Sequence, residues 1–266
     1  MLALTDQRRR GYCIIFYYHA ISTADRNRFA AQMDVAMKWS SPIAVGCTKP
    51  LQDGKTYFSV TFDDALQSVA DNALPELRRR NIPTTIFVVT RSLDQLPTWI
   101  KQECHTSTTD KVMSADTLKN SMSDLVVYGS HSLTHPYLSH VDDAEACRQI
   151  TLSRFELQSL LGVQVTLFSF PYGAFDEDHV RSCRDAGYQR VFTTLPRPAI
   201  FDPEEFVCGR IVVDPTDWSL EFFLKLQGAY SWLPWAFSLK RNLKLAFHLR
   251  KRDQHVSRLK NESQNP

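Results

Sequence analysis

Two adjacent carboxylates and a spaced pair of histidines are the residues best suited to chemistry in this sequence. Asp63 and Asp64 directly follow an apolar stretch, residues 57–62, that is typical of a buried strand. Acids at the end of such a strand are costly unless they bind a cation, act in catalysis or cap the next helix. His131 and His135 are four residues apart, a spacing that would bring both imidazoles to one face of a helical turn. With one carboxylate they could hold a divalent cation, although such a histidine pair alone is more often structural.

The elements that must position these residues alternate between strands and helices. The pattern predicts strands over residues 12–18, 43–45, 57–62, 84–89, 125–129, 165–170, 189–193 and 207–213. It predicts helices over residues 25–39, 65–80, 114–121, 142–161 and 176–186, and a last helical region from residue 217. This alternation indicates an α/β domain with a parallel sheet, open or closed into a barrel, whose functional groups lie at the C-terminal strand ends. His19, Asp63–Asp64, His131 and Pro171–Tyr172 each follow a predicted strand, so we expect them on one rim.

Length and composition fit an ordinary globular protein of one large or two small domains. The chain has 266 residues, of which 43% are hydrophobic and 23% are charged. Its six cysteines include no CxxC pair, which argues against a zinc knuckle or a redox motif and favours reduced thiols. The apolar run at residues 12–18 is too short to span a membrane, and no signal-peptide cleavage site follows it. We therefore expect a cytoplasmic protein.

The C-terminal part of the chain is basic and rich in aromatic residues. Residues 223–266 contain nine Lys or Arg against two Asp or Glu, whereas residues 1–222 contain 22 against 27. Apolar residues recur there at helical spacing, which favours a helix packed on the main domain over peripheral contact with an anionic membrane. No recognition motif for nucleic acid accompanies the positive charge. We predict a catalytic domain over residues 1–215 and a helical extension over residues 216–266.

Three segments together resemble the first three motifs of the polysaccharide deacetylases, the NodB-homology group or carbohydrate esterase family 4. They are Thr61-Phe-Asp-Asp64, Ser130-His-Ser-Leu-Thr-His-Pro136 and Phe168-Ser-Phe-Pro-Tyr-Gly173. The resemblance covers roughly residues 12–215 and implies a distorted (β/α)7 barrel. It also implies a hydrolase that removes N-acetyl groups from an N-acetylated amino-sugar polysaccharide or a lipid-linked saccharide.

The same resemblance implies a role for each motif residue. Asp64, His131 and His135 would be the metal ligands, with zinc the default ion and cobalt or nickel the alternatives. Asp63 would be the general base for a metal-bound water that attacks the acetamide. The backbone N–H of Tyr172 would help to stabilise the oxyanion, and the departing amine would need a proton from a general acid.

The sequence departs from the family pattern at the acid and at one arginine. Many members carry the acid in a late Leu-x-His motif, but the late strand Gly209–Asp214 contains no histidine. The early Tyr17-Tyr-His-Ala-Ile21 resembles the Tyr-His opening of the poly-N-acetylglucosamine deacetylases, a branch with circularly permuted barrel order. This resemblance implies that His19 is the acid, a hydrogen-bonded structural histidine being the alternative. Ser169 stands where many members have the arginine that orients the base; Arg210 could replace it, or could equally form a surface ion pair. The predicted substrate-binding residues are Pro171, Tyr172 and Arg210.

These observations predict a metal-dependent polysaccharide deacetylase. One alternative is a glycan-binding barrel that has lost turnover, which the altered third motif leaves open. Another is a peptidase or other amidohydrolase, which would cleave amides that are not part of a sugar.

Overall fold

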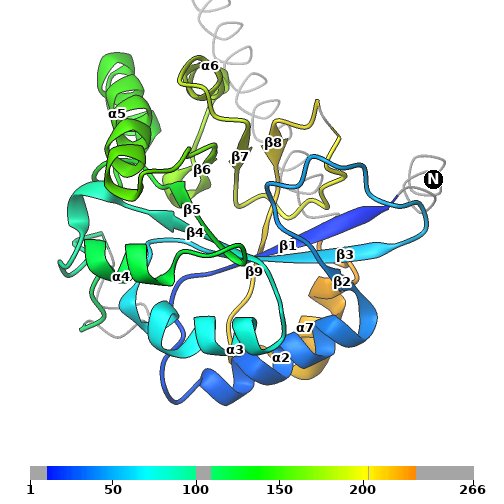
Figure 1. Cartoon of the computed structure of the whole chain (residues 1–266). Helices are drawn as coiled ribbons and strands as arrows, with labels where there is room; N and C mark the ends of the chain where they lie inside the picture. Colours follow the sequence, from blue (N-terminus) through cyan, green and yellow to red (C-terminus); the bar gives the residue numbers. More distant parts are fainter. Residues whose placement is uncertain (1–10, 100–108, 203, 232–266) are drawn as a thin grey trace, which may run out of the picture.

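The computed structural model describes residues 11–99, 109–202 and 204–231 (Figure 1). The strands are β1 (Tyr12–Tyr18), β2 (Ser41–Pro42), β3 (Thr56–Phe62), β4 (Thr84–Val88), β5 (Val126–Ser130), β6 (Leu167–Ser169), β7 (Arg190–Phe192), β8 (Val207–Cys208) and β9 (Ile211–Val212). The helices are α2 (Arg26–Trp39), α3 (Leu74–Arg79), α4 (Ala115–Ser121), α5 (Asp143–Leu161), α6 (Glu177–Asp185) and α7 (Ser219–Leu226). Strand and helix alternate along most of the chain, as the sequence predicts.

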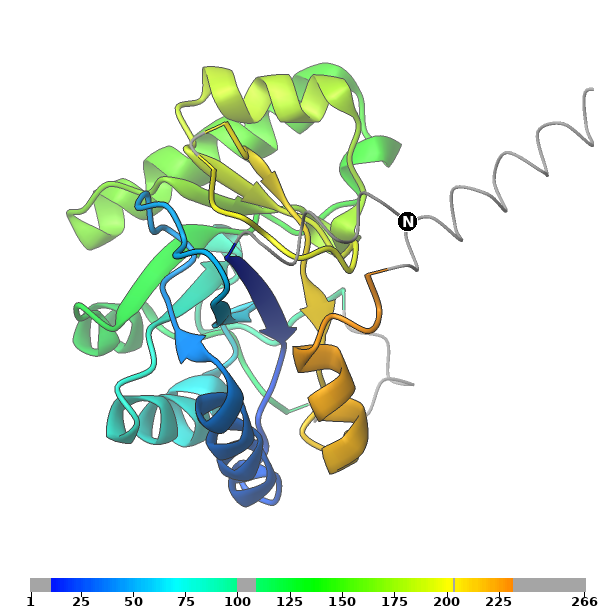
Figure 2. The same cartoon turned by 90° about the vertical axis from the view of Figure 1, so that its right-hand side faces the viewer.

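The strands form one parallel sheet that curls into a barrel-like shape. Its order is β8-β7-β6-β5-β4-β3-β1-β9, with β2 paired to β3. Strands β8 and β9 lie at opposite ends of this order, yet only Gly209 and Arg210 separate them in sequence, so the sheet must curl until its edges approach. Cys13 and Ala199 add reciprocal backbone hydrogen bonds of 2.7 and 2.8 Å on the β1 edge. Figure 2 shows the strands around a common axis with the helices outside. The predicted α/β barrel-like fold is confirmed.

The alternation of side chains along β1 separates the core into two parts. Ile14, Phe16 and Tyr18 belong to a large cluster that also contains helix residues, so this face of the sheet packs against the helices. Cys13 and Ile15 belong to a smaller cluster that draws on β4, β6, β7 and β8 and on no helix, which places it on the inner side of the curled sheet. Side chains at the C-terminal end of the inner side are therefore directed toward the barrel axis.

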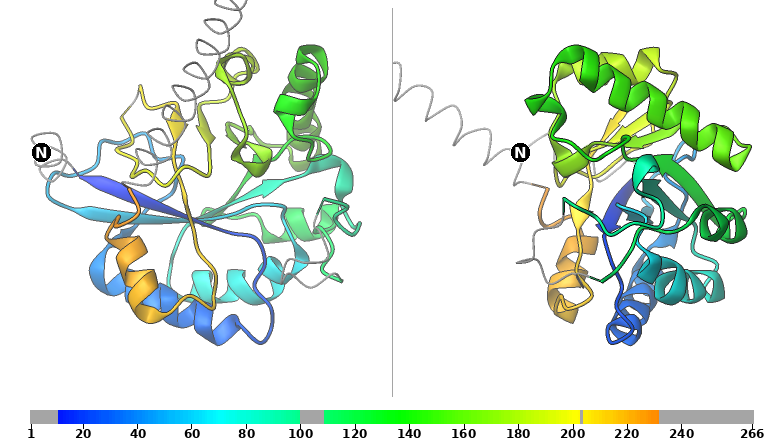
Figure 3. Two further views of the ribbon diagram at one scale, coloured as in Figure 1. Left: turned by 180° about the vertical axis from the view of Figure 1, so that it is seen from behind. Right: turned by 90° about the vertical axis from the view of Figure 1, so that its left-hand side faces the viewer.

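Helix boundaries follow the capping residues that the sequence offers. Asp142 accepts a hydrogen bond from the backbone N–H of Glu145 at the start of α5, and Gly162 ends this helix with a φ of 70°. Helix α7 packs beside α2, as the rear view in Figure 3 shows, and buries Phe222 against Phe16 with 5.1 Å between ring centroids. The first part of the predicted extension is thus integrated into the barrel core.

Three predicted elements differ in the structure. The strand expected over residues 43–45 lies two residues earlier, at β2; Ile43 still donates its backbone N–H to the carbonyl oxygen of Phe58 in β3 at 2.9 Å, but Val45 lies in a turn. The single strand expected over residues 207–213 is divided into β8 and β9 at opposite sheet edges. The helix expected from residue 65 begins after Leu66 and contains a π-helical turn, Val69–Ala73, ahead of Pro75, whose missing N–H prevents a regular helix there.

Two predictions concern the termini and the compartment. The basic tail, residues 232–266, lies outside the described residues, so its helical packing and its membrane contact stay predictions. Among helices in the described ranges, none has the length and apolar character needed to cross a membrane. The five cysteines in these ranges are free thiols.

Candidate active site

The C-terminal strand ends bring the predicted residues to one rim of the barrel. His19 follows β1, Asp63 follows β3, His131 follows β5 and Pro171 lies two residues beyond β6. Because side chains alternate along a strand, Asp63 continues the face of Ser59 and Thr61, which points away from the helix-packed cluster. Neither aspartate caps the following helix: the carboxylate of Asp63 accepts from Arg210, and that of Asp64 accepts from Trp99.

Asp63 is buried against the guanidinium of Arg210. Nη1 and Nη2 of Arg210 donate to Oδ1 and Oδ2 of Asp63, each at 2.7 Å. Burial alone would raise the pKa of Asp63, but the charge of Arg210 and the hydrogen bonds that it donates outweigh burial and hold this pKa below its usual range. Asp63 is therefore ionised at neutral pH and can accept a proton.

Arg210 is fully buried, which excludes the surface ion pair that we considered. Besides Asp63, it donates to Oγ of Ser169 at 2.7 Å, to Oγ1 of Thr61 at 3.2 Å and to the carbonyl oxygen of Thr193 at 3.3 Å. All five of its N–H donors thus have partners inside the protein. A guanidinium with no free donor does not suit the substrate-binding role predicted for Arg210.

The junction between β8 and β9 explains how Arg210 reaches this position. A Cβ atom at Gly209 would overlap the backbone carbonyl of Leu195, so only glycine lets the chain pass there. The guanidinium then lies between two aromatic rings, 4.7 Å from the centroid of Tyr17 and 5.3 Å from that of Phe87.

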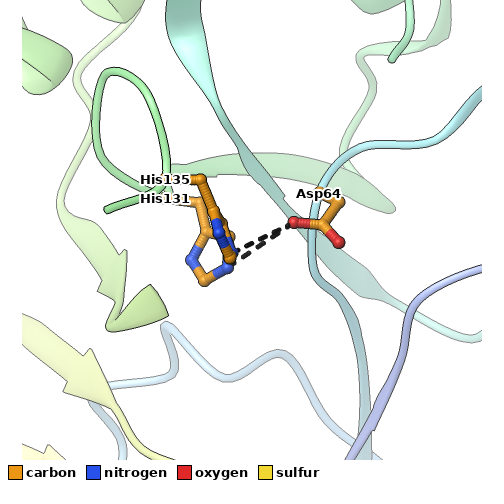
Figure 4. A group of neighbouring side chains, drawn as sticks. All are labelled: Asp64, His131 and His135. Atoms are coloured by element: carbon orange, nitrogen blue, oxygen red, sulfur yellow. Dashed lines mark ion pairs between the residues drawn. The ribbon is translucent and has the colours of Figure 1, made fainter. Parts of the chain in front are cut away.

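Asp64, His131 and His135 converge on a common point (Figure 4). Oδ1 of Asp64 lies 3.8 Å from Nε2 of His131 and 3.5 Å from Nε2 of His135, and one ligand atom from each residue falls within 4.8 Å of the others. All three residues are buried. Two nitrogens and one oxygen at this spacing are a donor set suited to a divalent transition metal such as zinc.

The electrostatics of the three residues fit a cation. Burial lowers the pKa of His135 to about 2, so the imidazole is neutral and keeps a lone pair for a ligand bond. Nδ1–H of His131 can donate to the carbonyl oxygen of Ser169 at 2.7 Å, which leaves Nε2 free to coordinate. Burial raises the pKa of Asp64, because the favourable interactions around its carboxylate do not fully offset the loss of solvation. A bound cation would supply that missing charge.

The histidines meet through a loop rather than through the helical turn that their spacing suggested. Residues 131–137 are irregular, and both Ser132 and His135 have positive φ, at 69° and 60°. Asp64 and Ala65 also have positive φ, at 69° and 52°. Such backbone conformations are uncommon for residues other than glycine and concentrate at functional sites.

Two residues that sequence analysis missed support this loop. Gln149 on α5 is buried, and its Oε1 accepts the backbone N–H groups of Leu133 and Thr134 at 3.0 and 3.1 Å. Trp99, in the segment after β4, donates its indole N–H to Oδ1 of Asp64 at 3.1 Å. Gln149 occupies a buried position of a strongly predicted helix, a mismatch that could have signalled its role; Trp99 lay in a stretch with no clear pattern.

The remaining predicted residues surround this centre. His19 is exposed and directly follows Tyr18, whose carbonyl oxygen accepts the backbone N–H of Asp63 at 2.9 Å, so it lies beside the two aspartates. Pro171 is buried, whereas Tyr172 is 39% exposed and places its ring edge-on to His135 at 4.5 Å. The backbone N–H of Tyr172 donates to no residue in the part of the chain that the structure describes.

Comparisons with known proteins identify the family of this chain. The model of the family described as polysaccharide deacetylase matches residues 51–191. YxkH of Bacillus subtilis (strain 168), whose name assigns it provisionally to the polysaccharide deacetylases, is 22% identical over 76% of this chain and 71% of its own.

Solved structures share the fold. IcaB from Ammonifex degensii matches with a TM-score of 0.67 and 22% identity, covering 81% of this chain and 97% of its own. The Streptococcus pyogenes deacetylase PplD, solved with acetate, matches with a TM-score of 0.65 and 16% identity over 82% of this chain and 99% of its own. The family match spans more than half of the chain and includes both aspartates, both histidines and the Pro171–Gly173 turn. This chain therefore belongs to the polysaccharide deacetylase family.

Proposed function

We propose that this protein is a metal-dependent hydrolase that removes N-acetyl groups from an N-acetylated amino-sugar polysaccharide or a lipid-linked saccharide. The observation that carries the proposal is the buried convergence of Asp64, His131 and His135, adjacent in sequence to the ionised Asp63. Family membership supports deacetylation of a polysaccharide. The metal, the mechanism and the identity of the glycan are our inference.

In this proposal Asp64, His131 and His135 hold the cation, zinc by default and cobalt or nickel as alternatives. When bound, such an ion polarises a carbonyl and makes water a better nucleophile at neutral pH. Asp63 is kept ionised by Arg210 and accepts the proton of the attacking water as general base. Arg210 acts as a positioning residue, because its bidentate contact fixes both oxygens of that carboxylate.

Two further residues complete the proposed chemistry. His19 is exposed on the same rim and would give a proton to the departing amine as general acid. The backbone N–H of Tyr172 lies in a tight turn, with a φ of 58°, and would help to stabilise the developing negative charge on the acetamide oxygen. Gly173 makes this turn possible, since a Cβ there would overlap the side chain of Thr194. Pro171 and Tyr172 would border the bound sugar.

Acetate release tests the proposal. N-acetylglucosamine oligomers and longer N-acetylated glycans would be incubated with wild-type protein, with a chelator, and with chelator followed by Zn²⁺. We expect release that chelation abolishes and Zn²⁺ restores, and a loss of about 10²–10⁴-fold for Asp63→Asn, the range for a general base.

The control variant for this assay is Asp53→Asn, whose carboxylate lies in a loop before β3. It should match the wild type. Wild-type protein that releases no more acetate than Asp63→Asn across the panel, while still binding glycan, would instead support a barrel that binds sugar without turnover. Metal-dependent cleavage of amides outside sugars would favour an amidohydrolase of another class.

A further inference from the structure

Trp99 contacts two of the three residues that we propose as metal ligands. Its indole N–H donates to Oδ1 of Asp64 at 3.1 Å. Its ring stacks on the imidazole of His135, with 4.7 Å between centroids and 17° between planes. We infer that Trp99 is a positioning residue of the metal site, which holds the Asp64 carboxylate and the His135 ring in the orientations that face the ion. This inference rests on the proposed metal site.

The hydrogen bond from Trp99 is made to Oδ1 of Asp64, the carboxylate oxygen nearest to both histidines. Oδ1 of Asp64 is the atom that faces Nε2 of both histidines, at 3.8 and 3.5 Å. The terminal torsion of an aspartate is broad, so a carboxylate without a directional partner can turn its oxygens away. An indole N–H donates and cannot accept or coordinate. It therefore orients Oδ1 without competing for the cation.

The stacking contact replaces a hydrogen bond that His135 lacks. A metal-ligating histidine usually donates its second ring nitrogen to a carbonyl or carboxylate, which fixes the ring. His131 has this partner in the carbonyl oxygen of Ser169. Nδ1 of His135 is buried and has no hydrogen-bond partner among the described residues. Its ring is held instead by the stacked face of Trp99 and by the edge-on ring of Tyr172.

The segment that carries Trp99 is anchored to the histidine loop. After β4, the backbone N–H of Thr90 donates to the carbonyl oxygen of Ser132 at 3.2 Å. The backbone N–H of Arg91 donates to the carbonyl oxygen of Leu133 at 2.9 Å. Trp99 itself is partly buried against the main core. These hydrogen bonds fix the segment that carries Trp99 to the loop that contains both histidines. A positioning role for the indole requires such a fixed arrangement.

Zinc affinity of the full-length apoprotein, measured by competition with a chromophoric chelator, tests this inference. Trp99→Phe keeps a ring against His135 but removes the N–H, and we expect about tenfold weaker Zn²⁺ binding, within the range for lost outer-shell partners of a metal ligand. Trp99→Leu removes both contacts and should weaken binding further. Trp39→Phe is the matched control, because Trp39 lies half-exposed at the end of α2 against Phe223. It should bind Zn²⁺ within about twofold of the wild type, the scatter we allow for a change outside that shell.

Wild-type affinity in Trp99→Phe would overturn this inference alone, provided that the wild type itself binds Zn²⁺. A wild type that binds no Zn²⁺ would overturn the proposed metal site and this inference together. If the Trp99 variants do not fold, the indole N–H resonances of the five tryptophans in wild-type protein decide. One indole N–H resonance should shift when Zn²⁺ is added and broaden when Co²⁺ is added. If no indole resonance responds to either ion, the role inferred for Trp99 at the metal site is contradicted.

Discussion

Arg210 binds both oxygens of Asp63 through both terminal guanidinium nitrogens, at 2.7 Å each, within the barrel interior. Ser169 extends this contact, because its hydroxyl accepts from Arg210 while its carbonyl oxygen lies 2.7 Å from Nδ1 of His131. The proposed base and one proposed metal ligand are thus oriented through a single residue of β6. Ser169 therefore links the Arg210–Asp63 pair to His131.

Replacing Arg210 should destabilise the protein and shift its pH dependence. Arg210→Met leaves Asp63 buried without a partner, which we expect to lower the free energy of unfolding by about 3–5 kcal/mol. The pKa of Asp63 should rise because burial then acts without the opposing charge. Since the base must be ionised, the acidic limb of the activity profile should move to higher pH. Rates measured between pH 4 and 9 at a temperature where the variant is folded check this shift.

Arg190 provides the matched comparison for Arg210. It is also a buried arginine, but it donates to the backbone carbonyls of Val45 and Cys47 and not to the site. Arg190→Met should lose stability while the acidic limb stays where it is in the wild type. Equal displacement of the limb in both variants would contradict the positioning role of Arg210.

The loss of activity on replacing His19 should depend on the leaving group of the substrate. An amine must be protonated as it departs, whereas p-nitrophenolate leaves without help, so only the first reaction needs a general acid. We expect His19→Ala to lose about 10²-fold or more in kcat on an N-acetylated sugar and to hydrolyse p-nitrophenyl acetate nearly as fast as the wild type. Equal losses on both substrates would assign His19 a structural role.

Gln149 should support the metal site from a distance. Gln149→Met removes the acceptor of two backbone N–H groups in the histidine loop, at a cost of about 1–3 kcal/mol for each group left unpaired. We expect lower thermal stability together with weaker Zn²⁺ binding. Gln149→Glu keeps an acceptor oxygen but sets a second carboxylate against Glu145, whose Oε1 accepts from Nε2 of Gln149 at 2.8 Å in the wild type, so it should restore only part of the affinity. A Met variant with unchanged Zn²⁺ affinity would show that the loop needs no such support.

Glu76 should contribute stability that acid removes. Hydrogen bonds from Arg80, Arg79 and Arg26 lower the pKa of Glu76 to about 2 from an ordinary value of 4.5. Its contribution is complete above the unfolded-state pKa and is lost as pH falls from about 5 toward 2. Glu76→Gln should therefore cost about 2 kcal/mol at pH 7 and much less at pH 3, as measured by urea unfolding.

The control for Glu76 is a carboxylate in an exposed pair. Asp178 pairs with Arg181 at 2.7 Å while both side chains are about two-thirds exposed, so solvent screens the interaction. Asp178→Asn should change stability little at either pH. A Glu76→Gln penalty that stays constant between pH 7 and pH 3 would contradict the ionic origin of its contribution.

The strands and helices were largely predictable because apolar periodicity reports which faces are buried. The runs that became β1, β3 and β4 are dense in β-branched and aromatic residues, and Gly162 marks the end of α5. The division of residues 207–213 was not predictable, since it depends on closure of the sheet around Gly209. Local sequence cannot encode which distant edge a strand will meet.

The site residues that belong to sequence motifs were predictable. The residues that join the site through long-range contacts were not. Asp63, Asp64 and both histidines could be selected because each follows a strand. The partner of Asp63 could not be decided, because Arg210 is 147 residues away along the chain. Nothing in its neighbours distinguishes a buried arginine from a surface one. Trp99 was missed for the same reason, since its contacts arise only when the segment after β4 folds over the rim.

The most direct test of the account is an anomalous-scattering map from crystals of this protein soaked with Zn²⁺. We predict one strong peak within ligand distance, about 2.0–2.2 Å, of Asp64, His131 and His135, and its loss in Asp64→Asn crystals. Absence of a peak there in fully soaked wild-type crystals, or an equal peak in the variant, would contradict the claim that these three side chains hold a catalytic metal.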